Sequence, residues 1–115
     1  MANTFKVVTK AGVTSEDIIY TVAGSTTTVI LGLVLGNTTT SQTTVTVTLS
    51  SNTGSRAGDN DENNQDVELV TNAPIPSGSS LEMLAGNKVV METTDLLKVT
   101  GSGATDVCLS IMEIT

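Results

Sequence analysis

Residues 43–50 read Thr-Thr-Val-Thr-Val-Thr-Leu-Ser, in which polar and apolar side chains alternate with a period of two. Successive side chains of a β-strand point to opposite faces, so Val45, Val47 and Leu49 would share one face and the threonines the other. Antiparallel strands with one face in a core and one in solvent have this pattern. The segment therefore predicts a half-buried strand.

Similar short segments occur along the whole chain and are separated by turn residues. Further strands are expected at residues 4–9, 17–23, 26–35, 66–71, 79–84, 88–91, 96–100 and 106–114. Turn-forming residues occupy positions 23–25, 36–37, 76–78, 86–87 and 101–103. No longer window has a helical stripe of apolar residues. We predict an all-β fold with almost no helix: a single β-sandwich or jelly-roll-like domain over residues 1–115, with about 8–9 short antiparallel strands.

Residues 29–35, Val-Ile-Leu-Gly-Leu-Val-Leu, look apolar on both faces of the expected strand. A surface strand of a small monomeric sandwich normally has polar residues on one side. We therefore expect this strand to be central and covered, or to meet another subunit.

The C-terminal strand is also apolar on both faces. Its odd positions from 107 to 111 hold valine, leucine and isoleucine, whereas the other face carries Cys108, Met112 and Ile114. Because a contiguous exposed apolar patch usually marks an interaction site, these three residues are candidate interface residues.

The charge and aromatic content argue against several partners. The chain of 115 residues has 12 acidic and 5 basic residues, a formal net charge of −7. Such a chain is repelled by phosphate backbones and by anionic membrane surfaces. Phe5 and Tyr20 are its only aromatic residues, which leaves little for stacking on bases. We expect neither nucleic acid nor membrane as a partner. The N-terminal residues lack the pattern of a signal peptide, so no secretion by that route is expected.

Residue types needed for common catalytic sites are missing. The sequence has no histidine, and Cys108 is its one cysteine, so neither an imidazole base nor an internal disulfide is available. The cysteine is expected to be an ordinary thiol. We therefore predict a protein that is not an enzyme and has no cofactor.

Residues 51–66 form a polar, acidic stretch in which Ala57 is the one apolar residue. It cannot bury enough apolar area to offset the entropy of ordering, so a long exposed loop is expected. Its carboxylates are weak candidates for calcium ligands. The spacing begins like an EF-hand loop, but asparagine replaces the turn glycine and valine the closing glutamate, which favours a solvated loop. The candidates are Asp59, Asp61, Glu62 and Asp66.

Taken together, these segments resemble small virion structural proteins of tailed bacteriophages. The resemblance lies in residues 29–37, 43–49, 67–81, 86–91, 95–100 and 106–114, and residues 51–66 depart from it by being longer and more acidic. It implies a non-enzymatic role in a virion and leaves the position in the particle open. Our first hypothesis is a capsid decoration (cement) protein that docks on the major capsid protein. A neck or tail accessory subunit is the close alternative.

A second class of function is a stand-alone β module that binds calcium or a glycan, although the shortage of aromatics disfavours glycans. The virion interpretation implies synthesis in the host cytoplasm and incorporation into the particle. Burial of an apolar strand face would then favour a homo-oligomer, a trimer or a dimer.

Overall fold

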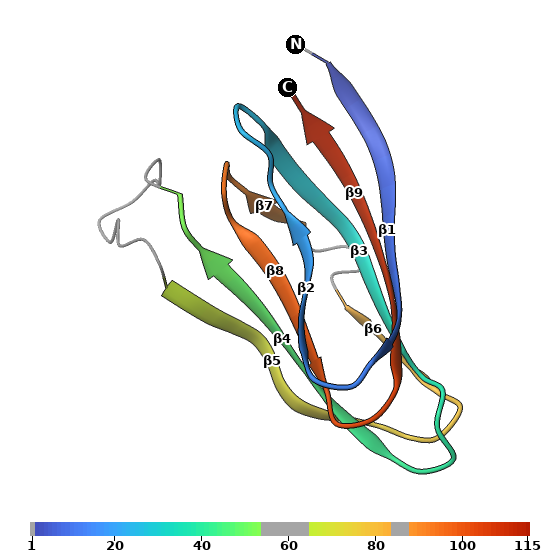
Figure 1. Cartoon of the computed structure of the whole chain (residues 1–115). Coiled ribbons are helices and arrows are strands. Elements are labelled where there is room, and N and C mark those ends of the chain that lie inside the picture. The colour runs from blue at the N-terminus through green and yellow to red at the C-terminus, as the bar shows by residue number, and fades with distance from the viewer. Residues whose placement is uncertain (1, 54–64, 84–87) are drawn as a thin grey trace.

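The computed structural model describes residues 2–53, 65–83 and 88–115, and every regular element in these ranges is a β-strand (Figure 1). Each strand expected from the sequence is present, although several run longer. None of the described residues forms a helix that could span a membrane. The strands are β1 (Asn3–Val13), β2 (Glu16–Thr21), β3 (Thr27–Asn37), β4 (Thr43–Ser51), β5 (Gln65–Ile75), β6 (Ser80–Met83), β7 (Val89–Met91), β8 (Leu96–Gly101) and β9 (Thr105–Ile114).

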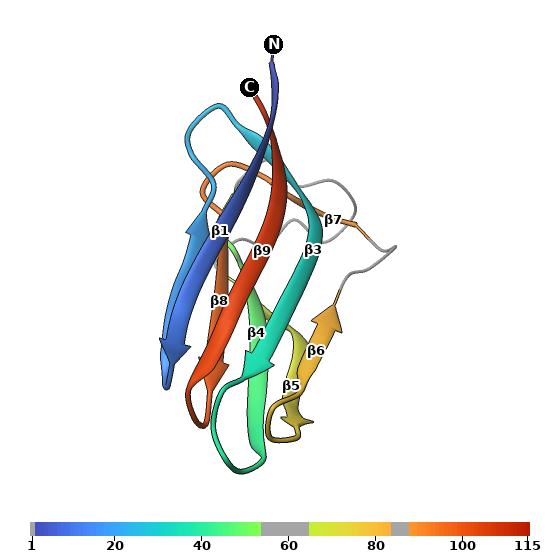
Figure 2. The same cartoon turned by 90° about the vertical axis from the view of Figure 1, so that its right-hand side faces the viewer.

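The strands form two sheets that pack face to face (Figures 1 and 2). Sheet A has the order β1-β9-β3-β6, with β7 also paired to β3, and sheet B has the order β2-β8-β4-β5. All of these pairs are antiparallel. Two four-stranded sheets connected in this order make a jelly roll, to which β7 is an addition. The predicted all-β sandwich or jelly roll is confirmed.

The core between the sheets is aliphatic. As predicted, Val45 and Val47 of β4 point into it, and Leu49 packs at its margin. The polar face of β4 is less exposed than expected: Thr48 is buried because it lies in a central strand, where longer side chains of β5 and β8 flank it. The core residues that are 1% exposed or less include Ile30, Leu33, Leu35, Val45, Val47, Leu97, Val99, Leu109 and Ile111.

A β-bulge accounts for part of the apolar pattern of residues 29–35, while Val29 and Val34 remain apolar on the face away from the core. The register of β3 against β9 shifts between Ile30 and Gly32, so Leu31 is the extra residue of a β-bulge. Side chains before the bulge point into the core at even positions, and those after it at odd positions. Ile30, Leu33 and Leu35 are therefore all buried in the core. A simple period of two cannot reveal such a shift.

The turn predicted at Gly36-Asn37 is wrong, because both residues belong to β3. Asn37 is 3% exposed, and its amide group organises the following loop instead. Its Nδ2 donates to the carbonyl oxygens of Ser41 and Ile75, each at 2.8 Å. Its Oδ1 accepts from the N–H of Thr39 at 2.8 Å and from the hydroxyl of Thr39 at 2.7 Å. The side chain thus ties the β3–β4 loop to the end of β5.

The acidic stretch is described only at its two ends. Ser51 closes β4 and Gln65 opens β5, while residues 54–64 lie outside the described residues, as do the 86–87 turn and its predicted hairpin. The prediction of an exposed loop is wrong at Thr53, which is 5% exposed. The buried Asp95 holds this segment in place. Its Oδ1 accepts from the N–H groups of Asn52 at 2.8 Å and Thr53 at 3.0 Å.

The other oxygen of Asp95 accepts from the N–H of Glu92 at 3.0 Å, so three backbone donors depend on one carboxylate. We expect Asp95→Ala to lower the free energy of unfolding by roughly 3 kcal/mol, because buried donors would lose their acceptor. Asp95→Asn keeps one acceptor oxygen and should cost less. Chemical denaturation of the three proteins measures both, and an unchanged midpoint for Asp95→Ala would contradict this role.

Candidate functional site: the outer face of sheet A

The strand register decides which side chains point away from sheet B. Residues that pair across antiparallel strands share a face, and the partners of buried core residues therefore point inward. Phe5 and Val29 both pair with Met112, and Val34 pairs with Cys108. These side chains alternate with the buried positions of β9 and so share the outer face. Its apolar members are Phe5, Val7, Val29, Val34, Val90, Cys108, Met112 and Ile114.

No described element covers this face. Figure 2 shows sheet A from outside, with β1, β9, β3 and β6 towards the viewer. Among the described residues six large hydrophobic side chains are exposed, and four of them lie on this face: Phe5 at 71%, Val7 at 63%, Val90 at 55% and Val34 at 39%. The one phenylalanine of the chain is thus on the surface, and a large exposed aromatic ring is typical of interaction sites.

The three interface candidates from the sequence lie within this face. Cys108 is exposed, and Met112 and Ile114 are half-buried. They occupy alternate positions of β9, which is flanked by β1 on one side and β3 on the other. Their role in an interface stays a prediction, but the structure surrounds them with further apolar side chains from three other strands.

A shallow hollow of about 360 Å³ lies at one end of the face, between β1, β9 and β3. Its lining includes small residues on three neighbouring strands, namely Ala11, Gly36 and Cys108. Val34 forms part of the wall. A hollow of this kind can accept an apolar side chain from a partner surface.

The charges that the register places on the face are acidic. Glu82 pairs with Val34, and Asp106 pairs with Gly36, so both carboxylates lie at the same end of sheet A. One oxygen of Asp106 accepts from the N–H of Gly12 at 3.0 Å. A complementary surface would be apolar in the middle and basic opposite these two carboxylates.

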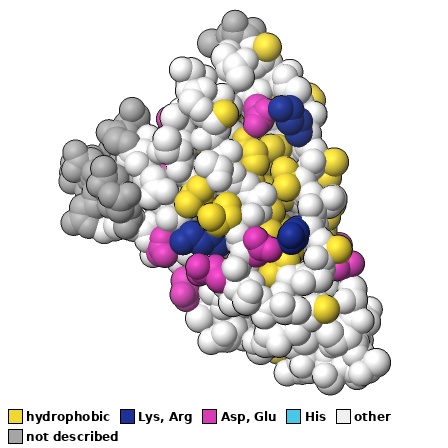
Figure 3. All heavy atoms as spheres, viewed as in Figure 1, with side chains coloured by type: hydrophobic (Ala, Val, Ile, Leu, Met, Phe, Trp, Pro, Cys, Tyr) yellow, Lys and Arg dark blue, Asp and Glu magenta, His cyan; other side chains and the backbone are white. Residues whose placement is uncertain are grey.

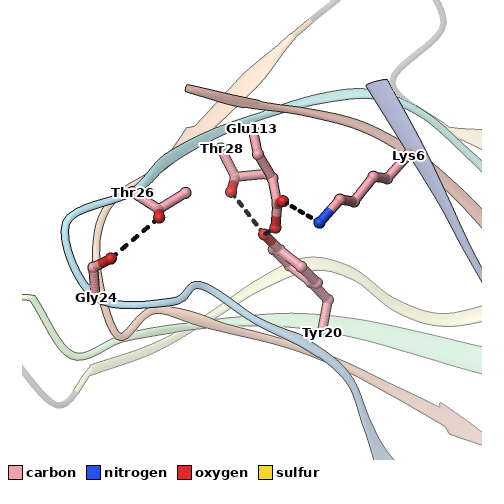
Figure 4. Close-up of polar contacts among 6 residues, drawn as sticks. All are labelled: Lys6, Tyr20, Gly24, Thr26, Thr28 and Glu113. Carbon is pink, nitrogen blue, oxygen red and sulfur yellow. Dashed lines mark hydrogen bonds and ion pairs between the residues drawn. The ribbon is translucent and has the colours of Figure 1, made fainter. Parts of the chain in front are cut away.

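Polar side chains hold the two sheets together on the side of β1 and β2. Figure 4 shows Tyr20 of β2 pointing across to Glu113 of β9 and Thr28 of β3. The Tyr20 hydroxyl donates to Glu113 Oε2 at 2.5 Å, and Lys6 Nζ lies 2.7 Å from Glu113 Oε1. Tyr20 lies 2.8 Å from the Thr28 hydroxyl, which donates to it because the tyrosine proton is already engaged.

A second cross-sheet contact lies further along the same side of the molecule. Lys10 Nζ of β1 is 3.6 Å from Asp17 Oδ2 of β2, and both side chains are substantially exposed. Figure 3 shows hydrophobic side chains in a line between the sheets on this side, with basic and acidic side chains next to one another along it. Exposed ion pairs contribute little, so the hydrogen bond between Tyr20 and Glu113 is the main polar link between the sheets on this side of the molecule.

This link shifts the pKa of both of its titrating groups. Burial, and then the hydrogen bond to Glu113, raise the pKa of the Tyr20 hydroxyl to about 12, against the smaller opposing effect of Thr28. The Glu113 pKa is lowered, first by Lys6 and then by Tyr20. The neutral tyrosine and the ionised glutamate are therefore both favoured in the folded protein.

The calcium candidates are not brought together in the described structure. Asp66 lies in β5, opposite Ser50, and its Oδ2 is 3.6 Å from Lys98 Nζ. Asp59, Asp61 and Glu62 lie outside the described residues. Among the residues that are described, no three acidic or other metal-binding side chains form a cluster that could hold an ion.

Comparison with known proteins gives a likeness of fold alone. No family model and no curated protein matches the chain. A chain from the disulfide-linked pili of Bacillus endospore appendages is 16% identical over 96% of this chain and 85% of that one, with a TM-score of 0.45. A chain of infectious bursal disease virus, Gx strain, is 8% identical over 98% of this chain and 37% of that one, with a TM-score of 0.38. Neither likeness transfers a function.

The part of the outer face that lies on β1 was not predicted from the sequence. Phe5 and Val7 alternate with Lys6 and Val8, which is a visible strand pattern, but the sequence does not say which side of β1 faces the core. Here the outward side is the apolar one, and Lys6 points towards sheet B. The pairing partner, Ile111 for Lys6, settles this orientation, and it lies more than a hundred residues away.

The raised pKa of Tyr20 predicts a change in stability at alkaline pH. A group whose folded pKa is raised contributes stability that is present below its unfolded pKa, near 10, and is lost as pH rises through about 12. We expect Tyr20→Phe to lower the free energy of unfolding by about 1.5 kcal/mol at pH 8. The difference from the unaltered chain should shrink between pH 10 and 12.

Urea denaturation of both proteins at several pH values measures this difference. Because the two proteins differ in one hydroxyl group alone, the comparison between them isolates the contribution of Tyr20. A difference that stays constant up to pH 12 would show that the hydroxyl does not stabilise the fold through its proton.

Proposed function

We propose that this protein is a non-enzymatic structural subunit of a bacteriophage particle, a capsid decoration protein that docks on the major capsid protein through the outer face of sheet A. The observation that carries the proposal is the apolar band across β1, β9, β3 and β7, which no described element covers. Burying such a band against a shell would stabilise the assembled state by mass action.

The resemblance of the sequence to small virion proteins supports the same function. The jelly roll is compatible with it, since capsid domains use this fold among many other proteins. The formal net charge of −7 suits an outer position better than contact with packaged DNA. The acidic end of the face, at Glu82 and Asp106, would sit opposite basic residues of the shell.

The surface can be tested with charge substitutions on the two central strands of sheet A. Val34→Asp together with Met112→Asp places two carboxylates in the middle of the face. Burying them against a partner would cost several kcal/mol, so we expect the variant to fold but to be absent from gradient-purified particles. Val67→Asp is the matched control, because Val67 is 49% exposed and lies on β5 of sheet B.

The readout is the amount of each variant in particles purified from cells infected with the phage that encodes it, together with electron cryomicroscopy of those particles. Density at regular positions on the shell would support the decoration role. Density confined to the neck or tail would instead support the role of an accessory subunit. Normal incorporation of the double variant would exclude this face as the docking surface.

A further inference from the structure

Strand β1 presents an open sheet edge. It lies at the end of sheet A and, within the described residues, its one ladder partner is β9. Its residues from Asn3 to Val7 and from Thr9 to Gly12 are exposed. A strand edge of this kind offers unpaired backbone groups to another chain.

The unpaired groups can be assigned by residue. Ala2 and Thr115 exchange two backbone hydrogen bonds, at 3.1 and 2.9 Å, which fixes the phase of the ladder between β1 and β9. Because hydrogen-bonded pairs alternate along an antiparallel ladder, the even residues of β1 point their N–H and C=O groups at β9. The odd residues Asn3, Phe5, Val7 and Thr9 point theirs at the open edge, and their side chains lie on the outer face.

The other edges are interrupted or short. β5 has two register shifts against β4, a proline at position 74 and a left-handed residue, Asn72, with φ 48°. β2 has six residues and a register shift between Ile18 and Tyr20. β6 and β7 have four and three residues. Bulges, prolines and short strands are the usual protection against edge pairing, and β1 runs in unbroken register from Asn3 to Lys10.

Lysines also protect edges, but those of β1 are engaged elsewhere. Lys6 is held by Glu113 at 2.7 Å, and Lys10 lies 3.6 Å from Asp17. Both side chains therefore extend towards the opening between the sheets and do not project past the free edge.

We propose that the free edge of β1 pairs with β1 of a second copy, antiparallel across a two-fold axis, so that sheet A continues through a homodimer. A strand edge that pairs with its own copy needs no second kind of surface, which is the requirement for a closed two-fold contact. This proposal concerns the isolated chain and does not rest on the proposed virion function.

The side chains of β1 favour a register centred on Val7 over one centred on Lys6. Centring the axis on Lys6 would place Lys6 directly opposite Lys6 of the second copy, which is unfavourable. Centring it on Val7 places Lys6 opposite Val8 and pairs Phe5 with Thr9 of the second copy. The three odd-residue pairs of this register would form about six backbone hydrogen bonds, two in each hydrogen-bonded pair.

The dimer also enlarges the outer face. Four strands spaced by about 4.8 Å, with ten residues rising about 3.3 Å each, give a face of roughly 600 Å² per copy. A standard interface buries about 800 Å² per partner, so one copy alone is small. Two copies joined along β1 present one apolar face of roughly twice that area, with Val7 of each copy at its centre. This consequence for docking does rest on the proposed function.

Sedimentation velocity of the purified full chain tests the pairing. Val7→Pro removes an N–H that points at the free edge, and proline is tolerated at edge positions of this kind, so the pairing with β9 is retained. We expect a dimer for the unaltered chain and a dissociation constant weakened roughly tenfold or more by Val7→Pro. Val7→Ala, which keeps the N–H, should stay within a few-fold. A monomeric unaltered chain at about 100 µM, or equal dimerisation of Val7→Pro, would overturn the proposal.

Cross-linking tests the register even if Val7→Pro fails to fold. In a Cys108→Ser background, Val7→Cys puts one thiol on each side of the axis, and a short bismaleimide should join the two copies. Thr4→Cys in the same background is the control, because its two copies would lie about 20 Å apart. Cross-linking at Thr4 and not at Val7 would exclude this register. Both experiments use no phage particle, so their failure is distinguishable from failure of the docking proposal.

Discussion

The structure depends on the insertion of the C-terminal strand between β1 and β3. β9 pairs with both along almost its whole length, and it carries Leu109 and Ile111 into the core. Without β9, β1 has no ladder partner among the described strands, and β3 loses the neighbour against which its bulge forms. The fold therefore closes only when the two ends of the chain meet, a non-local pairing that makes folding slow and strongly cooperative.

Local pattern was enough to predict the strands, because a period of two and its interrupting turns are short-range properties. The local pattern did not predict the features that depend on how the strands pair. The bulge at Leu31 exists only in relation to β9, and it moves the inward side chains of β3 from even to odd positions, while Val29 and Val34 stay apolar on the outer face. Asn37 looks like a turn residue, yet it ends β3 as a buried amide whose partners include the carbonyl of Ile75, far along the chain. Neither feature can be read without the register.

The candidate site was predictable in part for the same reason. Met112 and Ile114 stand out because β9 has too many apolar residues for a one-sided strand. Phe5 and Val7 do not stand out in the sequence, since an alternating strand normally has one apolar side. The local sequence does not indicate that this side faces outward. The pairing with β9 gives the physical reason: Lys6 and Val8 lie opposite the buried Ile111 and Leu109, so Phe5 and Val7 are left outside.

Near β1, polar side chains therefore lie between the two sheets, and apolar side chains lie on the outer surface. Tyr20, Glu113 and Lys6 use their polar groups to link the two sheets, while the one phenylalanine of the chain lies outside. The link connects β9 of sheet A to β2 of sheet B. The strands of the outer face are already paired with one another, so a partner that bound this face would not have to order their backbone. Pairing along β1 would enlarge the area of this face, and its affinity for a partner would depend on how well the partner packs against it.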